Sequence, residues 1–273
     1  MGRLARLTGL SVAVWLAGCQ AVNTTNGGAV GVERKQYMFS MLSTQQVNQM
    51  YAQSYQQTLS EAAGKGVLEK NSTNAKRVNA IAQRLIAQAP VFRPDAAQWD
   101  WQVNLIDSDE LNANCGPGGK IIVYSGLIDK LKLSDDELAA VMGHEIAHAL
   151  REHGREAMSK AYATQMAQQG VGALLGLGQD SMALADSVVE YGMTLPNSRD
   201  NENEADLIGL ELSARAGYDP QAAISLWQKM SSNNAGAPPE FMSTHPSSSS
   251  RISALQNAIP KVMPLYQQAK AAR

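Results

Sequence analysis

The sequence predicts a helix-rich α+β fold with one small β-sheet. Apolar residues recur at helical spacing in most segments of the 273-residue chain. Strand-like apolar runs occur mainly at 100–107 and 120–124. Residues 19–273 are enough for one domain with a large core, and the chain has no internal repeat. A mainly helical domain with a small sheet belongs to the α+β class.

The N-terminus has the features of a secretory signal peptide. Arg3 and Arg6 precede the apolar run 10–16, and small residues follow up to Cys19. The apolar run is too short for a transmembrane helix, which needs about 20 residues. We therefore expect residues 1–18 to be removed. Residues 19–43 are predicted to be the new N-terminus and a linker, because the stretch 22–35 is rich in Asn, Thr and Gly and is typical of a tether.

Residues 44–273 form the predicted domain, and most of its elements are helices. Ser134 and Glu137 make a capping box that begins one of them. Gly217 is a stop signal, and Asp219-Pro220 supplies the N-cap and first residue of the next helix. Helices are expected at about 44–63, 73–88, 134–158, 160–175, 181–192, 202–216, 220–231 and 247–257.

The helix that begins near Ser134 carries the motif His144-Glu145-Ile146-Ala147-His148. Residues i and i+4 of a helix lie on one face, so both imidazoles can reach one zinc ion at about 2.0–2.1 Å. Glu145 is placed to hold a metal-bound water. The alternative is a histidine pair that packs in a core without metal.

A third ligand is expected from another helix. Glu202 and Asp206 are also i and i+4, so Glu202 can bind the metal while Asp206 accepts a hydrogen bond from a ligand histidine. Glu204 points elsewhere and is expected at the surface. His153 is nine residues from His144, which turns it to the opposite face of one helix and predicts a surface or second-layer role. The alternative for residues 198–206 is a solvated helix start.

These motifs, followed by Ala-Gly-Tyr-Asp-Pro at 216–220, resemble the gluzincin metallopeptidases of the HtpX-like and CAAX-prenyl-protease-like group. The resemblance runs from about 99 to about 255. It implies a zincin-like metalloprotease domain whose sheet borders the active-site cleft, with one zinc ion held by His144, His148 and Glu202. It also implies that Asp206 stands behind a ligand and that Glu145 acts as general base on a zinc-bound water.

The resemblance implies roles for two further segments. A strand bordering the cleft, at Asn112, Ala113 and Asn114, would pair with the substrate, although the small residues at 114–116 depart from the family pattern. A plain hairpin is the alternative. His245 resembles a histidine that approaches the zinc from a mobile loop in periplasmic members, where it either holds the enzyme latent or helps to stabilise an oxyanion. Arg199 is a second oxyanion candidate, and a loop histidine without a role is the alternative for His245.

The cysteines indicate the compartment. The stretch Leu-Ala-Gly-Cys at 16–19 resembles the lipobox of bacterial lipoproteins, which implies that Cys19 is lipidated. Gln20 is not the aspartate of inner-membrane retention, so we expect the periplasmic face of the outer membrane. An ordinary secretory signal with an incidental cysteine is the alternative. Cys115 is then left without a partner and is expected to be a small buried apolar residue.

The expected function is a zinc endopeptidase of the periplasm, acting on unfolded or misassembled envelope proteins. The chain has a net charge of −2 and no long basic run, so nucleic-acid binding is excluded. One rival is a chaperone or assembly factor that works with the outer-membrane assembly machinery and whose proteolysis is gated by His245. Another is a structural zinc lipoprotein. Residues 161–195 form either a lid over the cleft or two core helices.

Overall fold

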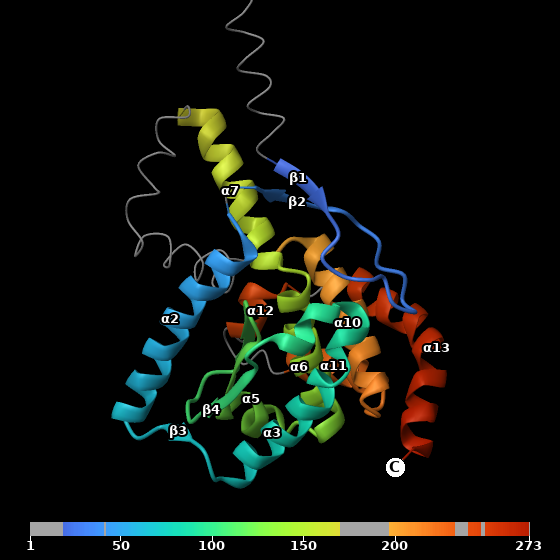
Figure 1. Cartoon of the computed structure of the whole chain (residues 1–273). Helices are drawn as coiled ribbons and strands as arrows, with labels where there is room; N and C mark the ends of the chain where they lie inside the picture. Colours follow the sequence, from blue (N-terminus) through green and yellow to red (C-terminus); the bar gives the residue numbers. More distant parts are fainter. Residues whose placement is uncertain (1–18, 41, 170–196, 233–239, 247–248, 273) are drawn as a thin grey trace, which may run out of the picture.

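The computed structural model describes residues 19–40, 42–169, 197–232, 240–246 and 249–272 (Figure 1). Helices surround a central helix, and two small sheets lie beside them. This arrangement confirms the predicted helix-rich α+β fold, although the sequence indicated only one of the two sheets. No helix within the described ranges combines the length and apolar character needed to cross a membrane.

The elements follow one another along the chain with short connections. The strands are β1 (Cys19–Val22), β2 (Gln36–Phe39), β3 (Leu68–Glu69), β4 (Gln102–Ile106), β5 (Ala113–Gly116) and β6 (Lys120–Tyr124). The helices are α2 (Thr44–Gly64), α3 (Thr73–Ile86), α4 (Ala89–Phe92), the 3-10 helix η1 (Pro94–Gln98), α5 (Ser125–Leu131), α6 (Asp135–Leu150), α7 (His153–Gln169), α10 (Arg199–Arg215), α11 (Ala222–Ser232), α12 (Glu240–Thr244) and α13 (Ser249–Ala271).

The larger sheet has the strand order β3-β4-β6-β5. β4 and β6 are parallel, whereas β3 and β5 pair antiparallel with their neighbours. β5 therefore forms one edge of this sheet, and β5 also packs against α6. The sheet thus borders the helix that carries the histidine motif.

Helix α6 is the centre of the domain. The predicted capping box is present, because the side chains of Ser134 and Glu137 each accept from the other's backbone N–H. Almost every residue of α6 is buried, since α3, α10, α11 and β5 all pack around it. Most of its apolar residues belong to the main hydrophobic core. A buried helix of this kind can hold side chains rigidly for a site.

Helix α6 ends at Leu150, so the predicted helix 134–158 is two helices. Glu152 has a left-handed backbone (φ 51°), and α7 begins in a new direction at His153. Two arginines hold the Glu152 carboxylate at this bend, with Arg93 at 2.6 Å and Arg155 at 2.7 Å. The ion pairs offset the cost of a left-handed non-glycine residue.

Helices α6 and α10 cross at two glycines. A Cβ atom on Gly209 would lie only 2.6 Å from the backbone nitrogen of His144. A Cβ atom on Gly143 would lie 2.9 Å from the Gly209 carbonyl oxygen. The two backbones approach this closely only because both positions lack a side chain. The contact sets the distance between the histidine motif and the first turn of α10.

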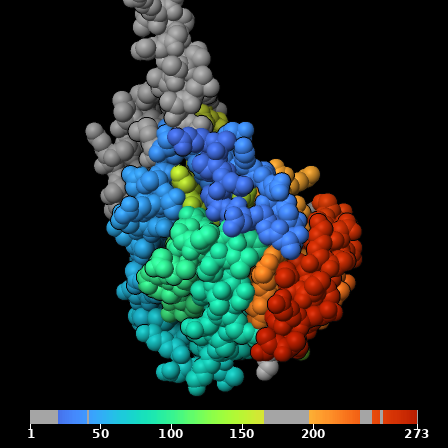
Figure 2. All heavy atoms as spheres, turned by 45° about the vertical axis from the view of Figure 1, so that its right-hand side comes forward, coloured from blue at the N-terminus to red at the C-terminus, as the bar shows by residue number. Residues whose placement is uncertain are grey.

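The N-terminal segment, defined here as residues 19–39, packs on the domain instead of forming a tether. β1 and β2 pair as an antiparallel ribbon, and Val30 and Val32 are buried in the main core. Figure 2 shows this segment in blue, covering one face and reaching the orange and red atoms of the C-terminal helices. The linker prediction was wrong because two valines and the ion pairs of Arg34 outweigh the Asn/Thr/Gly composition.

Other helix boundaries also differ from the prediction. α10 begins at Arg199 rather than at 202, because Ser198 caps it by accepting from the Asn201 N–H. α13 continues through Pro260 to Ala271, well beyond 257, with Val262 buried against the core. The predicted helix at 181–192 and most of the segment 161–195 lie outside the described residues.

Candidate active site

Four side chains from separate segments converge beside α6. His144 and His148 lie on α6, Glu202 lies in the first turn of α10, and His245 directly follows α12. His144 Nε2 is 3.1 Å from His148 Nε2 and 3.2 Å from His245 Nδ1. Glu202 Oε1 is 2.9 Å from His245 Nδ1 and 3.3 Å from His148 Nε2. All four side chains are buried, so the cluster is shielded from bulk water.

The spacing of these atoms fits one zinc ion. Zinc bonds to nitrogen and oxygen are about 2.0–2.1 Å long, so the corners of a tetrahedron around zinc are about 3.3–3.4 Å apart. The four contacts given above span 2.9–3.3 Å, and all four ligand atoms lie within 4.8 Å of one another, so small shifts would bring them onto one ion. Imidazole and carboxylate are also donor types that zinc takes in proteins. His144, His148 and Glu202 thus occupy the positions predicted for the ligands, and His245 lies at the fourth corner.

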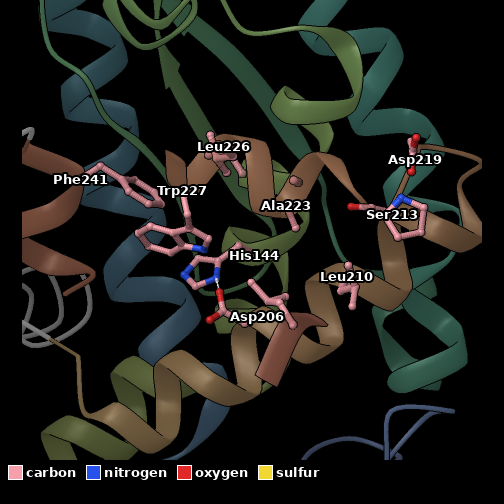
Figure 3. Close-up of a pocket in the computed structure, with 13 residues that line it drawn as sticks. His144, Asp206, Leu210, Ser213, Asp219, Ala223, Leu226, Trp227 and Phe241 are labelled. Atoms are coloured by element: carbon pink, nitrogen blue, oxygen red, sulfur yellow. Dashed lines mark hydrogen bonds and ion pairs between the residues drawn. The ribbon is translucent and has the colours of Figure 1, made fainter. Parts of the chain in front are cut away.

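Asp206 orients His144 in the way the i, i+4 spacing predicted. His144 Nδ1 is 3.0 Å from Asp206 Oδ1, so the Nδ1–H donates to the carboxylate and Nε2 faces the cluster. Figure 3 shows this contact in an apolar pocket that Trp227 and Phe241 help to line. Burial lowers the pKa of His144, but hydrogen bonds to Asp206 and Glu202 outweigh it and raise the pKa to about 9. Asp206 and Glu202 thus favour positive charge at this position, which either a proton on His144 Nε2 or a metal ion in its place can supply.

Glu145 is placed beside this cluster with a free acceptor atom. Its Oε1 is buried, has no hydrogen-bond partner among the described residues, and lies 3.4 Å from His245 Nε2. Burial raises the pKa of Glu145, which brings the carboxylate closer to the pH at which a general base works best. A buried acceptor left open beside a metal cluster is the arrangement expected for a base that waits for water.

Arg251 is a site residue that the sequence did not reveal. The Arg251 guanidinium contacts both Asp206 oxygens, at 2.6 and 2.7 Å, and lies 2.7 Å from Glu202 Oε2. Arg199 is the exposed first residue of α10, three residues before Glu202, and its role at the oxyanion stays a prediction. A signal for Arg251 existed, because an arginine in the first turn of a helix opposes the helix dipole and so calls for a nearby acid.

His153 and Glu204 are both buried, which corrects the prediction that Glu204 is a surface residue. His153 Nδ1 is 2.9 Å from His148 Nδ1, and His153 Nε2 is 3.1 Å from Glu204 Oε2. His153 thus lies directly behind a metal ligand, as a second-layer residue. The nine-residue spacing placed His153 on the face opposite His144 only if both residues lie in one continuous helix. The structure has a bend at Glu152 instead, and this bend turns His153 back toward α6.

The edge strand predicted beside the cleft is β5. Asn112 precedes it, Ala113 is buried within it, and the Asn114 side chain accepts from the Tyr51 hydroxyl at 3.4 Å. The Tyr51 ring explains the glycine at 116, because a Cβ atom on Gly116 would lie 1.9 Å from this ring. Cys115 is buried as predicted, and burial raises the pKa of its thiol.

Comparison with known proteins places this site in a recognised family. The family model of peptidase family M48 matches residues 72–259, which include every residue of the cluster. The mitochondrial metalloendopeptidase OMA1 of Schizosaccharomyces pombe is 32% identical over 225 residues, covering 82% of this chain and 64% of that protein. OMA1 of Arabidopsis thaliana is 36% identical over 176 residues, covering 63% of this chain and 35% of that protein.

A bacterial relative is similar over a comparable region. The beta-barrel assembly-enhancing protease of Escherichia coli (strain K12) is 31% identical over 209 residues. The match covers 70% of this chain and 40% of that protein. The chain thus spans 35–64% of the length of these three relatives.

Proposed function

The chain belongs to peptidase family M48, and on this basis we propose that it is a zinc-dependent metalloendopeptidase. The observation that carries the proposal is the pairing of a zinc-type ligand cluster with Glu145, whose buried Oε1 is left without a partner among the described residues. The finer placement, in the HtpX-like and CAAX-prenyl-protease-like group and its periplasmic lipoprotein branch, is part of the proposal.

The protein's own side chains then have distinct roles in peptide hydrolysis. A zinc ion held by His144, His148 and Glu202 would supply Lewis acidity and lower the pKa of a coordinated water to about 7. Glu145 accepts the proton of the attacking water and returns it to the leaving nitrogen. The substrate pairs with the β5 edge at 112–114 as an added strand. Its extended backbone is thereby held across the cluster.

The direct test is cleavage of an unfolded protein with and without a chelator. We expect the purified protein to cut casein or a denatured outer-membrane protein, to lose this activity on zinc removal and to regain it when zinc is returned. Cleavage that survives verified zinc removal would contradict the proposal. So would the absence of cleavage by both the wild type and a His245→Ala variant, because the second result removes gating as an explanation.

We further propose that the protein works in the bacterial envelope, anchored through Cys19 to the periplasmic face of the outer membrane. The signal-like residues 1–18, the lipobox-like end and the name of the Escherichia coli relative support this address. Its substrates would be unfolded or misassembled envelope proteins. Fatty-acid labelling of the wild type that is lost in Cys19→Ser would support the anchor, and equal labelling of both would exclude it.

His245 is proposed to gate the reaction. It lies 3.2 Å from His144 and 2.9 Å from Glu202, at the corner that a substrate or water needs. Its other nitrogen faces Glu145 at 3.4 Å. This position favours a His245 that keeps the enzyme inactive over a His245 that stabilises the oxyanion of the transition state. It also supports the rival function, a chaperone or assembly factor with silent proteolysis. The structural zinc lipoprotein requires His245 to stay on the metal under all conditions.

Removing the gate should therefore activate hydrolysis. In the wild type, only molecules in which His245 has left the fourth corner can cleave. If these are about 10% of the population or less, His245→Ala should raise the rate of casein cleavage about tenfold or more. The measurement is the initial rate at equal zinc content, with the double variant Glu145→Gln/His245→Ala as the silent control. A rate that falls instead would assign His245 to transition-state stabilisation.

A further inference from the structure

The outer ring nitrogen of each ligand histidine on α6 has a hydrogen-bond partner, but the two partners differ in kind. His144 donates to the carboxylate of Asp206, which Arg251 holds in turn. Among the described residues, the partner of His148 Nδ1 is not a carboxylate but His153, whose Nδ1 lies at 2.9 Å. A ligand histidine normally donates its outer N–H to a carboxylate, a carbonyl or water. The imidazole behind His148 therefore needs a partner of its own.

The positions of the protons on His148 and His153 follow from the hydrogen-bond distances. His148 offers Nε2 to the cluster, so its proton is on Nδ1 and is donated to the Nδ1 lone pair of His153. His153 must then carry its proton on Nε2, which lies 3.1 Å from Glu204 Oε2. Each N–H donor in this series of hydrogen bonds has one acceptor, and the series ends on the Glu204 carboxylate. We call His148, His153 and Glu204 the relay.

The end of the relay is fixed by the N-terminal segment. The Arg34 guanidinium contacts Glu204 through Nε and Nη2, bonds Glu156 at 2.7 and 2.9 Å, and donates to Asn201 at 2.9 Å. Glu156 lies in α7, whereas Glu204 and Asn201 lie in α10. A single forked cation thus joins the helix that carries His153 to the helix that carries Glu202.

The geometry of the segment makes Arg34 a firm anchor. The Arg34 carbonyl accepts from Arg151 at 2.9 Å, and Arg151 also bonds Glu204 at 2.8 Å. Gln36, two residues on, bonds the Arg151 carbonyl from a fully buried position. Val32 on the other side lies in the core. Arg34 lies outside residues 72–259, the range that the family model matches.

We propose that Arg34 is a positioning residue of the metal site, which acts on His148 through Glu204 and His153. The N-terminal segment is therefore part of the active-site apparatus rather than a connection to it. The inference rests on the proposed zinc site, and it concerns metal binding rather than hydrolysis.

Zinc affinity, measured by competition with a chromophoric chelator, tests the proposal. Loss of a direct partner of a ligand typically weakens metal binding by about 10–100-fold. Arg34 acts two side chains further out, and Arg151 still holds Glu204, so Arg34→Ala should fall at or somewhat below the lower end, at about 3–10-fold. Lys35→Ala removes an equal charge from an exposed position next to it and should stay within about twofold of the wild type. An unchanged affinity in folded Arg34→Ala would overturn the proposal.

A double-mutant cycle separates the relay from general stabilisation. His153→Phe breaks the relay while filling much of the same space. In that background, Arg34→Ala should cost less than about twofold in zinc affinity, because its route to His148 is gone. Equal losses in both backgrounds would mean that Arg34 only stabilises the fold, and would overturn the proposal. If Arg34→Ala does not fold, Arg34→Lys, which cannot fork between two carboxylates, replaces it in the same cycle.

The outcomes also separate this proposal from the proposed function. Strong zinc binding that depends on Arg34 through His153, without peptide cleavage by the wild type or His245→Ala, would contradict the peptidase and support the relay. Peptide cleavage together with a zinc affinity that does not depend on Arg34 would support the peptidase and contradict the relay.

Discussion

Glu145→Gln is expected to abolish peptide hydrolysis while the protein stays folded and keeps its zinc. Gln has nearly the same shape as Glu but cannot accept a proton, and loss of a general base costs about 10²–10⁴-fold in rate. The ligand atoms of His144, His148 and Glu202 are unchanged by the substitution. The rate of casein cleavage and the zinc content of the purified variant measure the two halves of the expectation.

Glu61→Gln is the matched control for this substitution. Glu61 is an exposed residue of α2, so the same isosteric change there should leave both rate and zinc content near those of the wild type. Hydrolysis by Glu145→Gln at a rate close to that of the control would contradict the catalytic assignment. Loss of zinc along with the rate would instead make Glu145 a residue that maintains the cluster.

Gly209→Ala is expected to damage stability and metal binding together. Its Cβ atom would meet the backbone of α6 at 2.6 Å, so α6 and α10 would have to move apart. Overpacking of this kind costs about 1–3 kcal/mol in the free energy of unfolding. The same movement separates Glu202 from the two histidines. Urea unfolding and zinc titration measure the two effects.

Gly64→Ala makes the same change at a helical glycine with open space. Apart from the helix's own backbone and the neighbouring residues, no heavy atom of the described residues lies within 4 Å of a Cβ atom at this position. Stability should stay the same or rise by up to about 1 kcal/mol, because alanine favours a helix. If Gly209→Ala matched this control in stability and zinc affinity, the glycine contact would not set the spacing of the site.

The parts of the site that the sequence predicted are those with local patterns. The capping box at Ser134 and the i, i+4 pairs 144/148 and 202/206 each lie within one helix, where spacing alone determines the shared face. The structure brings these pairs together because α6 and α10 cross at their glycines. The sequence did not contain that crossing in any local form.

The parts that the sequence missed depend on distant partners. The bend after Leu150 is held by Arg93, which lies 59 residues before Glu152 in the chain. Glu204 is buried among Arg151, His153 and Arg34, and Arg34 lies 170 residues away in the sequence. The N-terminal segment has a linker composition, yet its few valines and one arginine find partners across the whole domain. No periodicity within a window of the sequence reports such contacts.

The long reach of the cluster has a consequence for biogenesis. His245 joins His144 across 101 residues, Arg251 joins Asp206 across 45, and Arg34 joins Glu204 across 170. Contacts between such distant residues carry the largest loop-closure entropy and form late in folding. A ribosome-bound chain that lacks residues 245–251 has neither the fourth corner nor the cation that holds Asp206. The nascent polypeptide is thus without a finished catalytic centre until Arg251 has been made and has reached Asp206.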